Sequence, residues 1–268
     1  MDATDFRDSV GRSAFVADLL PESLTEAGFW FLLQAYKLTT TFHSYQWMSK
    51  FLSSTEWMVE DYAEYLAIEG GPFEKVGEGA LSFYEMNIMH MIWADEIHLS
   101  KLVDTINNYL IDLIACAYKH DPNLIPSKAR YDLNFIRRFR TINDAIRGSA
   151  LAELDRISRA GFSEILSEAK RVTNCKLPEE TENKLHKLVK QRNEIVHRQG
   201  SYPEIIGSMF SKKRKPKEWF RHKPGDTIKA ERIGCEVVGL FEISAIDSGV
   251  EVGATKTEMF KDKEILTK

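Results

Sequence analysis

Apolar residues recur along most of the chain at the three- and four-residue spacing of amphipathic helices. The clearest stretch covers 81–119, where polar and apolar positions fall on separate faces. Its apolar face carries Leu99, Leu102, Val103, Ile106, Leu110 and Leu113. Clear alternating strand patterns are scarce. The pattern therefore predicts an all-α protein.

Proline and glycine divide the rest of the pattern into further predicted helices. Pro21 opens one that runs to Lys37, and an aromatic-rich stretch follows over 44–68. Pro122 and Pro126 end the long helix, because a residue before proline disfavours the helical conformation. The helices predicted downstream cover 132–147, 150–158, 162–172, the stretch from Pro178 to Gly200, and 231–250.

A glycine-rich cluster marks a candidate boundary before residue 80. Glu69-Gly70-Gly71-Pro72, followed by Gly77 and Gly79, cannot continue a helix. We therefore expect an N-terminal helical extension over 1–79, a helical domain over 80–255 and a C-terminal tail over 256–268. The sequence contains no internal repeat.

The composition is that of an ordinary globular protein, with 43% apolar and 28% charged residues. The net charge is −4, so any attraction to nucleic acid has to come from a local patch. No run reaches the roughly 20 apolar residues that span a bilayer, and the acidic start lacks a signal-peptide pattern. We expect a cytoplasmic protein without a membrane partner.

The three cysteines, Cys116, Cys175 and Cys235, are far apart and lack C-x-x-C spacing. An odd count with this spacing argues against a disulfide framework or a zinc finger. We expect reduced thiols, with Cys116 in a packing role.

One segment of the helix that begins at Pro178 combines chemistry with an unusual position. At 100° per residue, its apolar stripe contains Leu185, Leu188, Val189, Ile195 and Val196. Arg192 falls in the middle of this stripe. Since arginine is rarely buried alone, it must extend to solvent, pair with a carboxylate, or face an interface that binds an anion.

Asn193 and His197 lie close to Arg192 on the same helix. They are four residues apart, so their side chains can touch, whereas Arg192 and His197 are about 140° apart on an ideal helix. The long arginine side chain can reach around the helix edge. Ordinary solvation of a helix end would also account for His197, since a histidine there interacts favourably with the helix dipole.

The segment Arg192-Asn193-Glu194-Ile195-Val196-His197 resembles the R-polar-x3-H signature of HEPN domains, where asparagine commonly follows the arginine. Gly200 and a loop follow, as in many members, and the helices over about 90–250 resemble the HEPN bundle. The resemblance implies an HEPN-like helical bundle. Many members also carry an acidic residue on an earlier helix, for which Glu96 and Asp104 are candidates.

Catalytic HEPN proteins are metal-independent endoribonucleases, often dimeric, found in toxin–antitoxin, phage-defence and RNA-processing systems. The resemblance thus implies Arg192 and His197 as catalytic residues, Asn193 as a supporting residue, and no cofactor. The residue types suit this chemistry, because histidine can transfer the proton of the RNA 2′-hydroxyl and arginine can hold the phosphate. The implied partners are RNA, a second copy, and an antitoxin or regulatory protein.

Two other interpretations remain open. In one, the chain is an HEPN-like module that binds RNA, a nucleotide or a protein without cleaving anything. In the other, it is a helical interaction protein in which Arg192 only fills a salt bridge.

Two basic runs stand out in the sequence, and the first is a candidate RNA contact. The first surrounds Trp219 and Phe220, and basic groups interleaved with aromatic rings can hold phosphates while bases stack. Its predicted RNA-binding residues are Lys212, Lys213, Arg214, Lys215, Lys217 and Arg221. A solvated loop anchored by its aromatic rings is the alternative. The second run, Arg137-Arg138-Phe139-Arg140, is interpreted as the solvent face of a helix.

His90, Asp95, Glu96 and His98 invite a metal interpretation but lack a recognised ligand spacing. The two histidines would be about 12 Å apart along a helix, too far to share one ion unaided. We therefore predict no metal site.

Overall fold

The computed structural model describes residues 19–53, 83–126, 137–198 and 226–255. This part of the chain is almost entirely helical, so the predicted all-α class is confirmed. Its helices are α2 (Glu26–Ser53), α4 (Phe83–His120), α6 (Ile142–Ala160), α7 (Phe162–Thr173), α8 (Glu179–Arg198) and α10 (Asp226–Asp247), with the short 3₁₀ helix η1 (Pro122–Leu124). Two short strands, β1 (Ser23–Thr25) and β2 (Val252–Thr255), pair antiparallel.

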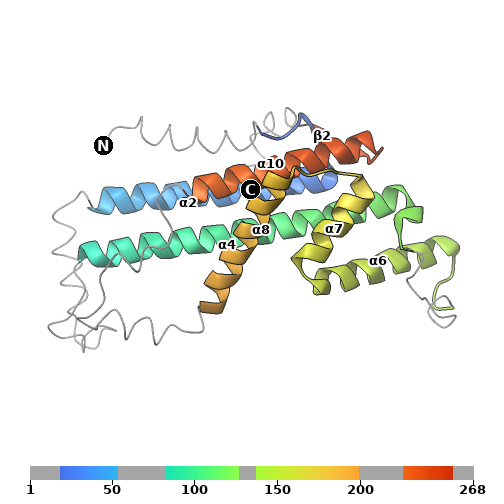
Figure 1. Ribbon diagram of the computed structural model, residues 1–268, viewed down its shortest axis with the longest axis horizontal. Coiled ribbons are helices and arrows are strands. Elements are labelled where there is room, and N and C mark those ends of the chain that lie inside the picture. The colour runs from blue at the N-terminus through green and yellow to red at the C-terminus, as the bar shows by residue number, and fades with distance from the viewer. Residues whose placement is uncertain (1–18, 54–82, 127–136, 199–225, 256–268) are drawn as a thin grey trace.

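Helix α4 is the central element of the structure. Helices α2 and α10 lie along it, α8 crosses it, and the α6–α7 pair packs near its C-terminal end (Figure 1). Leu102, Ile106, Leu110 and Leu113 from the predicted apolar face are buried, so the pattern of this helix is confirmed. No helix in the described part of the chain has the length and apolar character needed to cross a membrane.

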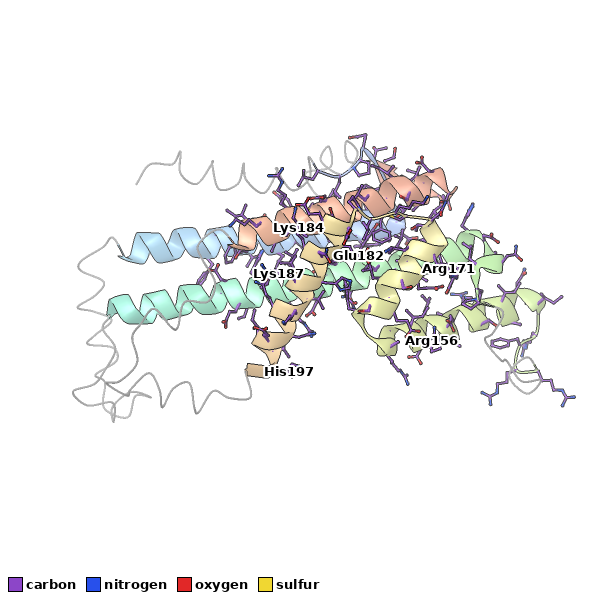
Figure 2. All side chains as sticks on the ribbon, in the orientation of Figure 1. Arg156, Arg171, Glu182, Lys184, Lys187 and His197 are labelled. Carbon is purple, nitrogen blue, oxygen red and sulfur yellow. The ribbon has the colours of Figure 1, made fainter. Side chains whose placement is uncertain are left out.

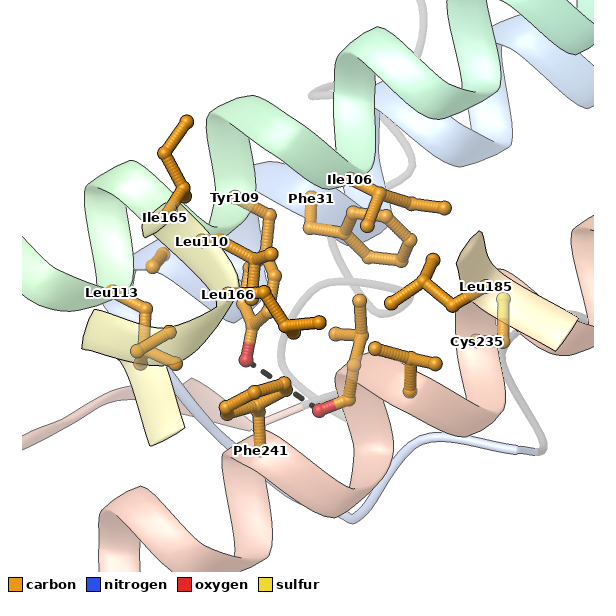
Figure 3. Packing of buried hydrophobic residues seen from close by; sticks show 14 of the residues in the cluster. Phe31, Ile106, Tyr109, Leu110, Leu113, Ile165, Leu166, Leu185, Cys235 and Phe241 are labelled. Atoms are coloured by element: carbon orange, nitrogen blue, oxygen red, sulfur yellow. Dashed lines mark hydrogen bonds between the residues drawn. The ribbon is translucent and has the colours of Figure 1, made fainter. Parts of the chain in front are cut away.

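The core is formed jointly by side chains of α2, α4, α7, α8 and α10 (Figure 3). Phe31 of α2 packs edge-on against Tyr109 of α4, with ring centroids 5.5 Å apart. Helix α2 belongs to the predicted extension over 1–79, yet it shares this core with the elements that follow residue 80. Burial of a shared core, rather than helix propensity, supplies most of the stability of such helices.

The start of the predicted first helix is wrong, because the chain there forms β1 instead. Leu24 and Thr25 of this strand are fully buried. Helix α2 also runs without a break through residues 37–44, between the end of the first predicted helix and the aromatic-rich stretch. Tertiary packing outweighs the low helix propensity of the threonine run here. The hydroxyl of Thr39, for example, donates to Glu231 of α10 at 2.9 Å.

The predicted helices over 132–147 and 150–158 are corrected to a single helix, α6, as far as the described residues go. It begins at Ile142 because Thr141 is its N-cap, with the Thr141 hydroxyl accepting from the Asp144 amide. Gly148 does not break the helix. Instead it makes room for a neighbouring ring, because a Cβ there would lie 2.1 Å from Cζ of Phe139.

The remaining boundaries agree with the predictions to within a few residues. Helix α7 ends at Thr173, one residue beyond its predicted end, and α8 begins directly after Pro178. Helix α10 starts five residues earlier than the predicted 231. Gly200, the predicted stop of α8, lies outside the described residues, as does the predicted loop over 69–79.

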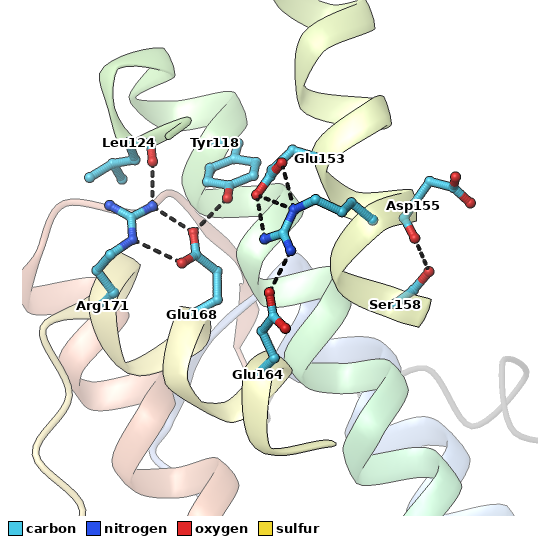
Figure 4. Close-up of polar contacts among 9 residues, drawn as sticks. Tyr118, Leu124, Glu153, Asp155, Ser158, Glu164, Glu168 and Arg171 are labelled. Carbon is cyan, nitrogen blue, oxygen red and sulfur yellow. Dashed lines mark hydrogen bonds and ion pairs between the residues drawn. The ribbon is translucent and has the colours of Figure 1, made fainter. Parts of the chain in front are cut away.

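Charged residues fix the α6–α7 pair to α4 (Figure 4). Arg156 of α6 bridges the carboxylates of Glu153 and Glu164, while the hydroxyl of Tyr118 donates to Glu168 at 2.6 Å. Burial raises the pKa of Glu168, but hydrogen bonds from Arg171 and Tyr118 outweigh it, so the pKa is lowered overall. The network therefore keeps this carboxylate charged at neutral pH.

A buried polar cluster joins β1, α4 and α10, and no motif in the sequence predicts it. Glu242 is fully buried, and it accepts hydrogen bonds from the Thr25 amide at 2.6 Å and from the Tyr109 hydroxyl at 2.8 Å. Burial raises the pKa of Glu242, and the hydrogen bonds offset this only in part. The only available signal was a glutamate between Val238 and Ala245, on the apolar face of α10.

This cluster predicts a pH dependence of stability. Because the folded-state pKa of Glu242 is raised, its contribution is full below the unfolded-state pKa of about 4.3 and declines as pH rises through the folded-state pKa. Glu242→Gln lacks this titration. The free energy of unfolding of the wild type should therefore fall relative to that of Glu242→Gln as pH rises above about 4. Urea unfolding at several pH values measures both free energies. Glu251→Gln, an exposed change of equal charge, is the control. Parallel wild-type and Glu242→Gln profiles would contradict the account.

Candidate active site

Helix α8 carries the predicted motif, and local signals explain where it begins. Pro178 precedes it, and three acidic residues occupy its first turn, where they favour the positive end of the helix dipole. Its buried face is formed by Leu185, Leu188 and Ile195, as the apolar stripe predicted. Val196, predicted on the same stripe, is 38% exposed. The stripe is thus covered along most of α8 but is partly open near its C-terminal end.

Arg192 lies within this stripe, and the structure shows how its charge is accommodated. Its Nε and Nη2 both donate to Oδ1 of Asp104 on α4, at 3.2 and 2.8 Å. Its Nη1 donates to Oδ1 of Asn193 at 3.2 Å. A guanidinium carries five N–H groups. One N–H therefore remains on each of the two terminal nitrogens for another acceptor.

The Arg192–Asp104 pair is only half-buried. The side chain of Arg192 is 32% exposed and that of Asp104 is 39% exposed. At such exposure an ion pair contributes about 0–1 kcal/mol to stability. The pair therefore orients the guanidinium more than it stabilises the fold. Of the two acidic candidates on the earlier helix, Asp104 is the one that forms this contact.

His197 is exposed in the last turn of α8, at the end of that helix that projects past α4 (Figure 2). Asn193 is exposed as well. Within the described part of the chain, the imidazole makes no hydrogen bond or ion pair. No described residue therefore occupies either ring nitrogen, and among the described residues little packing would be lost if the side chain were removed.

Helix α8 brings Arg192 and His197 to the same end of the bundle but not to the same face. Arg192 is on the side of α8 that contacts α4, whereas His197 is on the solvent side. This agrees with the 140° expected from helix geometry.

The other predicted site residues have different outcomes. The predicted RNA-binding residues lie outside the described part of the chain, so their RNA contact stays a prediction. These residues are Lys212, Lys213, Arg214, Lys215, Lys217 and Arg221. Arg137, Arg138 and Arg140 do not form the solvent face of a helix. They belong to a turn that precedes α6, because the Thr141 cap begins the helix only at Ile142.

The residues considered for a metal have protein partners. His98 is buried with its Nε2 2.8 Å from Oε1 of Glu231, and Asp95 accepts a hydrogen bond from Thr227 at 3.3 Å. Both contacts join α4 to α10. The side chain of His90 lies outside the described part. Among the residues that the structure describes, no group of three or more acidic, histidine or cysteine side chains could hold a metal ion.

The cysteines described by the structure are free thiols. Burial is the largest influence on each and raises the pKa of Cys116, Cys175 and Cys235. A raised pKa keeps a thiol protonated at neutral pH and therefore weakly nucleophilic. Cys235 and Cys175 are buried, whereas Cys116, predicted in a packing role, is half-buried against the core.

In comparisons with known proteins, no protein-family model matches this chain, and neither does any curated protein sequence or solved structure.

Proposed function

We propose that this protein is an HEPN-like, metal-independent endoribonuclease that cleaves RNA by transesterification. The observation that carries the proposal is how the guanidinium of Arg192 is held. This arginine is oriented by a carboxylate and an amide, is still a third exposed, and keeps N–H groups for an incoming phosphate. An arginine held in this way can bind phosphate oxygens through two parallel hydrogen bonds.

The proposed reaction uses the RNA 2′-hydroxyl as the nucleophile. His197 removes the proton of the 2′-hydroxyl while the 2′-oxygen attacks the adjacent phosphorus. The bond between phosphorus and the 5′-oxygen breaks, and that oxygen takes up a proton from water. Arg192 stabilises the charge on the phosphate oxygens, while Asp104 and Asn193 position its guanidinium.

A second copy of the chain would complete this site. Arg192 and the partly exposed Val196 lie at the open end of the apolar stripe of α8, which suits a homodimer contact. Since Arg192 and His197 face different sides of α8, we propose that Arg192 of one copy works with His197 of the other. We propose that the protein acts in the cytoplasm as a toxin or defence effector. Its proposed partners are RNA, a second copy of the chain, and an antitoxin or regulatory protein.

Mixing two inactive variants tests this shared site. Arg192→Lys and His197→Ala, refolded together, should form about 50% mixed dimers, each with one intact and one doubly altered site. Activity should therefore recover to about 25% of wild type, because each mixed dimer has half the normal number of sites. No recovery, or a monomer by light scattering at high concentration, would contradict the shared site.

A non-catalytic interaction module is the second candidate, and one observation favours it. Asp104 already neutralises Arg192, as a purely structural salt bridge would require. Incubation of the purified protein with total RNA in EDTA separates the two functions. The proposed nuclease degrades the RNA and loses this activity in His197→Ala, whereas an interaction module leaves the RNA intact.

A further inference from the structure

A cluster of exposed arginines lies away from the candidate active site. Arg137, Arg138 and Arg140 are exposed on the turn before α6, and Arg147 is exposed on the helix itself. The acidic residue closest in sequence, Asp144, accepts a hydrogen bond from the Thr141 hydroxyl at 2.8 Å. We call the segment 137–140 the basic turn. It carries a strong local positive charge on a chain whose net charge is −4.

Four arginines elsewhere in the described helices are paired, unlike those of the basic turn. Arg156, Arg159, Arg171 and Arg192 each form an ion pair with a carboxylate. Within the residues that the structure describes, none of Arg137, Arg138, Arg140 and Arg147 forms one. Their charge is therefore available to an external anion.

The position of the basic turn is fixed rather than arbitrary. The ring of Phe139 fills the space that Gly148 leaves open on α6, where even a methyl group would collide with it. Thr141 caps the same helix through the Asp144 amide. The contact of the Phe139 ring with α6 and the Thr141 cap thus hold three exposed arginines on one short turn. Presenting charged side chains from a fixed backbone lowers the entropic cost of binding.

We propose that the basic turn is a second RNA-binding surface, which contacts the phosphate backbone of a single strand. The choice of RNA rests on the proposed function. Arginine suits this partner because its planar fork matches phosphate oxygens in a bidentate manner. The ring of Phe139 is half-buried against Gly148, so we expect the arginine–phosphate contacts, which are independent of base sequence, to dominate.

An anionic membrane is the competing partner, and the apolar residues here fit it less well. Ile142, beside the turn, is 81% exposed, and Leu151 of the same helix is 60% exposed. Nine residues separate them, which places them on opposite sides of α6. A helix that lies on a bilayer needs its apolar side chains on one face. Phosphates of RNA therefore fit the basic turn better than phosphates of lipids.

The test measures binding of a fluorescent 2′-O-methyl oligouridylate, which lacks the nucleophile that cleavage requires. Arg137→Glu with Arg138→Glu should weaken binding at least tenfold at low salt. The slope of log affinity against log salt should become shallower by about 1.4, since each phosphate contact with a single strand contributes about 0.7. The control, Lys37→Glu with Lys176→Glu, reverses two exposed charges elsewhere and should change the affinity less than threefold.

Equal affinities for the variant and the wild type, or an equal loss in the control, would overturn the inference. Phosphatidylserine vesicles provide a third outcome. If the wild type binds them, and the Arg137→Glu, Arg138→Glu variant loses this binding while its RNA affinity is unchanged, the turn is a membrane contact and the inference is overturned. Circular dichroism checks that each variant is folded. Cleavage of unmodified RNA is followed separately. If the protein binds RNA through the turn but does not cleave it, only the proposed nuclease function is refuted. If the protein cleaves RNA but its binding does not depend on the turn, only this inference is refuted.

Discussion

His197→Ala should lower the rate constant of RNA cleavage by about 10²–10⁴-fold, which is the usual contribution of a general acid or base. The fold should not change, because His197 is exposed in the last turn of α8 and makes no hydrogen bond with another described residue. Single-turnover kinetics on a labelled RNA, together with thermal unfolding, measures both effects. His186→Ala is the matched control, an exposed histidine eleven residues earlier on the same helix.

The comparison of the two histidines decides whether the loss is chemical. His186 contacts the ring of Phe162, with centroids 6.1 Å apart, and lies 3.9 Å from Glu182. Its removal should therefore affect stability at least as much as removal of His197. Full cleavage activity in His197→Ala, or an equal loss in His186→Ala, would remove His197 from the mechanism.

Arg192→Lys should reduce cleavage by about 10²–10³-fold, the range seen when one donor to a developing charge is lost. Lysine keeps the charge but not the planar fork, so it cannot hold Asp104 and a phosphate at once in the same way. The unfolding free energy should fall by only about 0–1 kcal/mol, because the ion pair is partly exposed. Kinetics and urea unfolding on the same preparation separate these two quantities.

Asp104→Asn distinguishes a positioning partner from a structural one. Asparagine keeps an oxygen at this position that can accept from Arg192, so the guanidinium stays near its place while the negative charge is lost. Catalysis should therefore fall less than in Arg192→Lys. If Arg192→Lys keeps the wild-type cleavage rate and changes only the stability, Arg192 forms a purely structural salt bridge. That result would favour the non-catalytic interaction module.

The sequence predicted α8 well because its buried face repeats at helical spacing. It also predicted that Arg192 needs a carboxylate, solvent or an anion, since an isolated buried charge is costly. It could not choose Asp104, because the two residues are 88 positions apart in the chain. Which acidic side chain of α4 meets α8 depends on where the two helices cross, and no local pattern contains this information.

Glu242 and the basic turn illustrate the same limit. Glu242 interrupts an apolar face, and only the fold reveals that Thr25 and Tyr109 supply its hydrogen bonds from distant elements. Charge alone does not reveal where a helix starts, so the sequence pattern places the arginines of the basic turn on a helix. The capping role of Thr141 and the contact between Phe139 and Gly148 place them on a turn instead.

The chemistry of the cleaved ends tests the central claim most directly. The substrate is an RNA with 2′-O-methyl groups at every position except one, incubated with the wild-type protein in EDTA. The account predicts a single cut at the remaining 2′-hydroxyl, leaving a 2′,3′-cyclic phosphate and a 5′-hydroxyl. A cut at a methylated position, ends that carry a 5′-phosphate, or no cleavage until a divalent metal is added would contradict it.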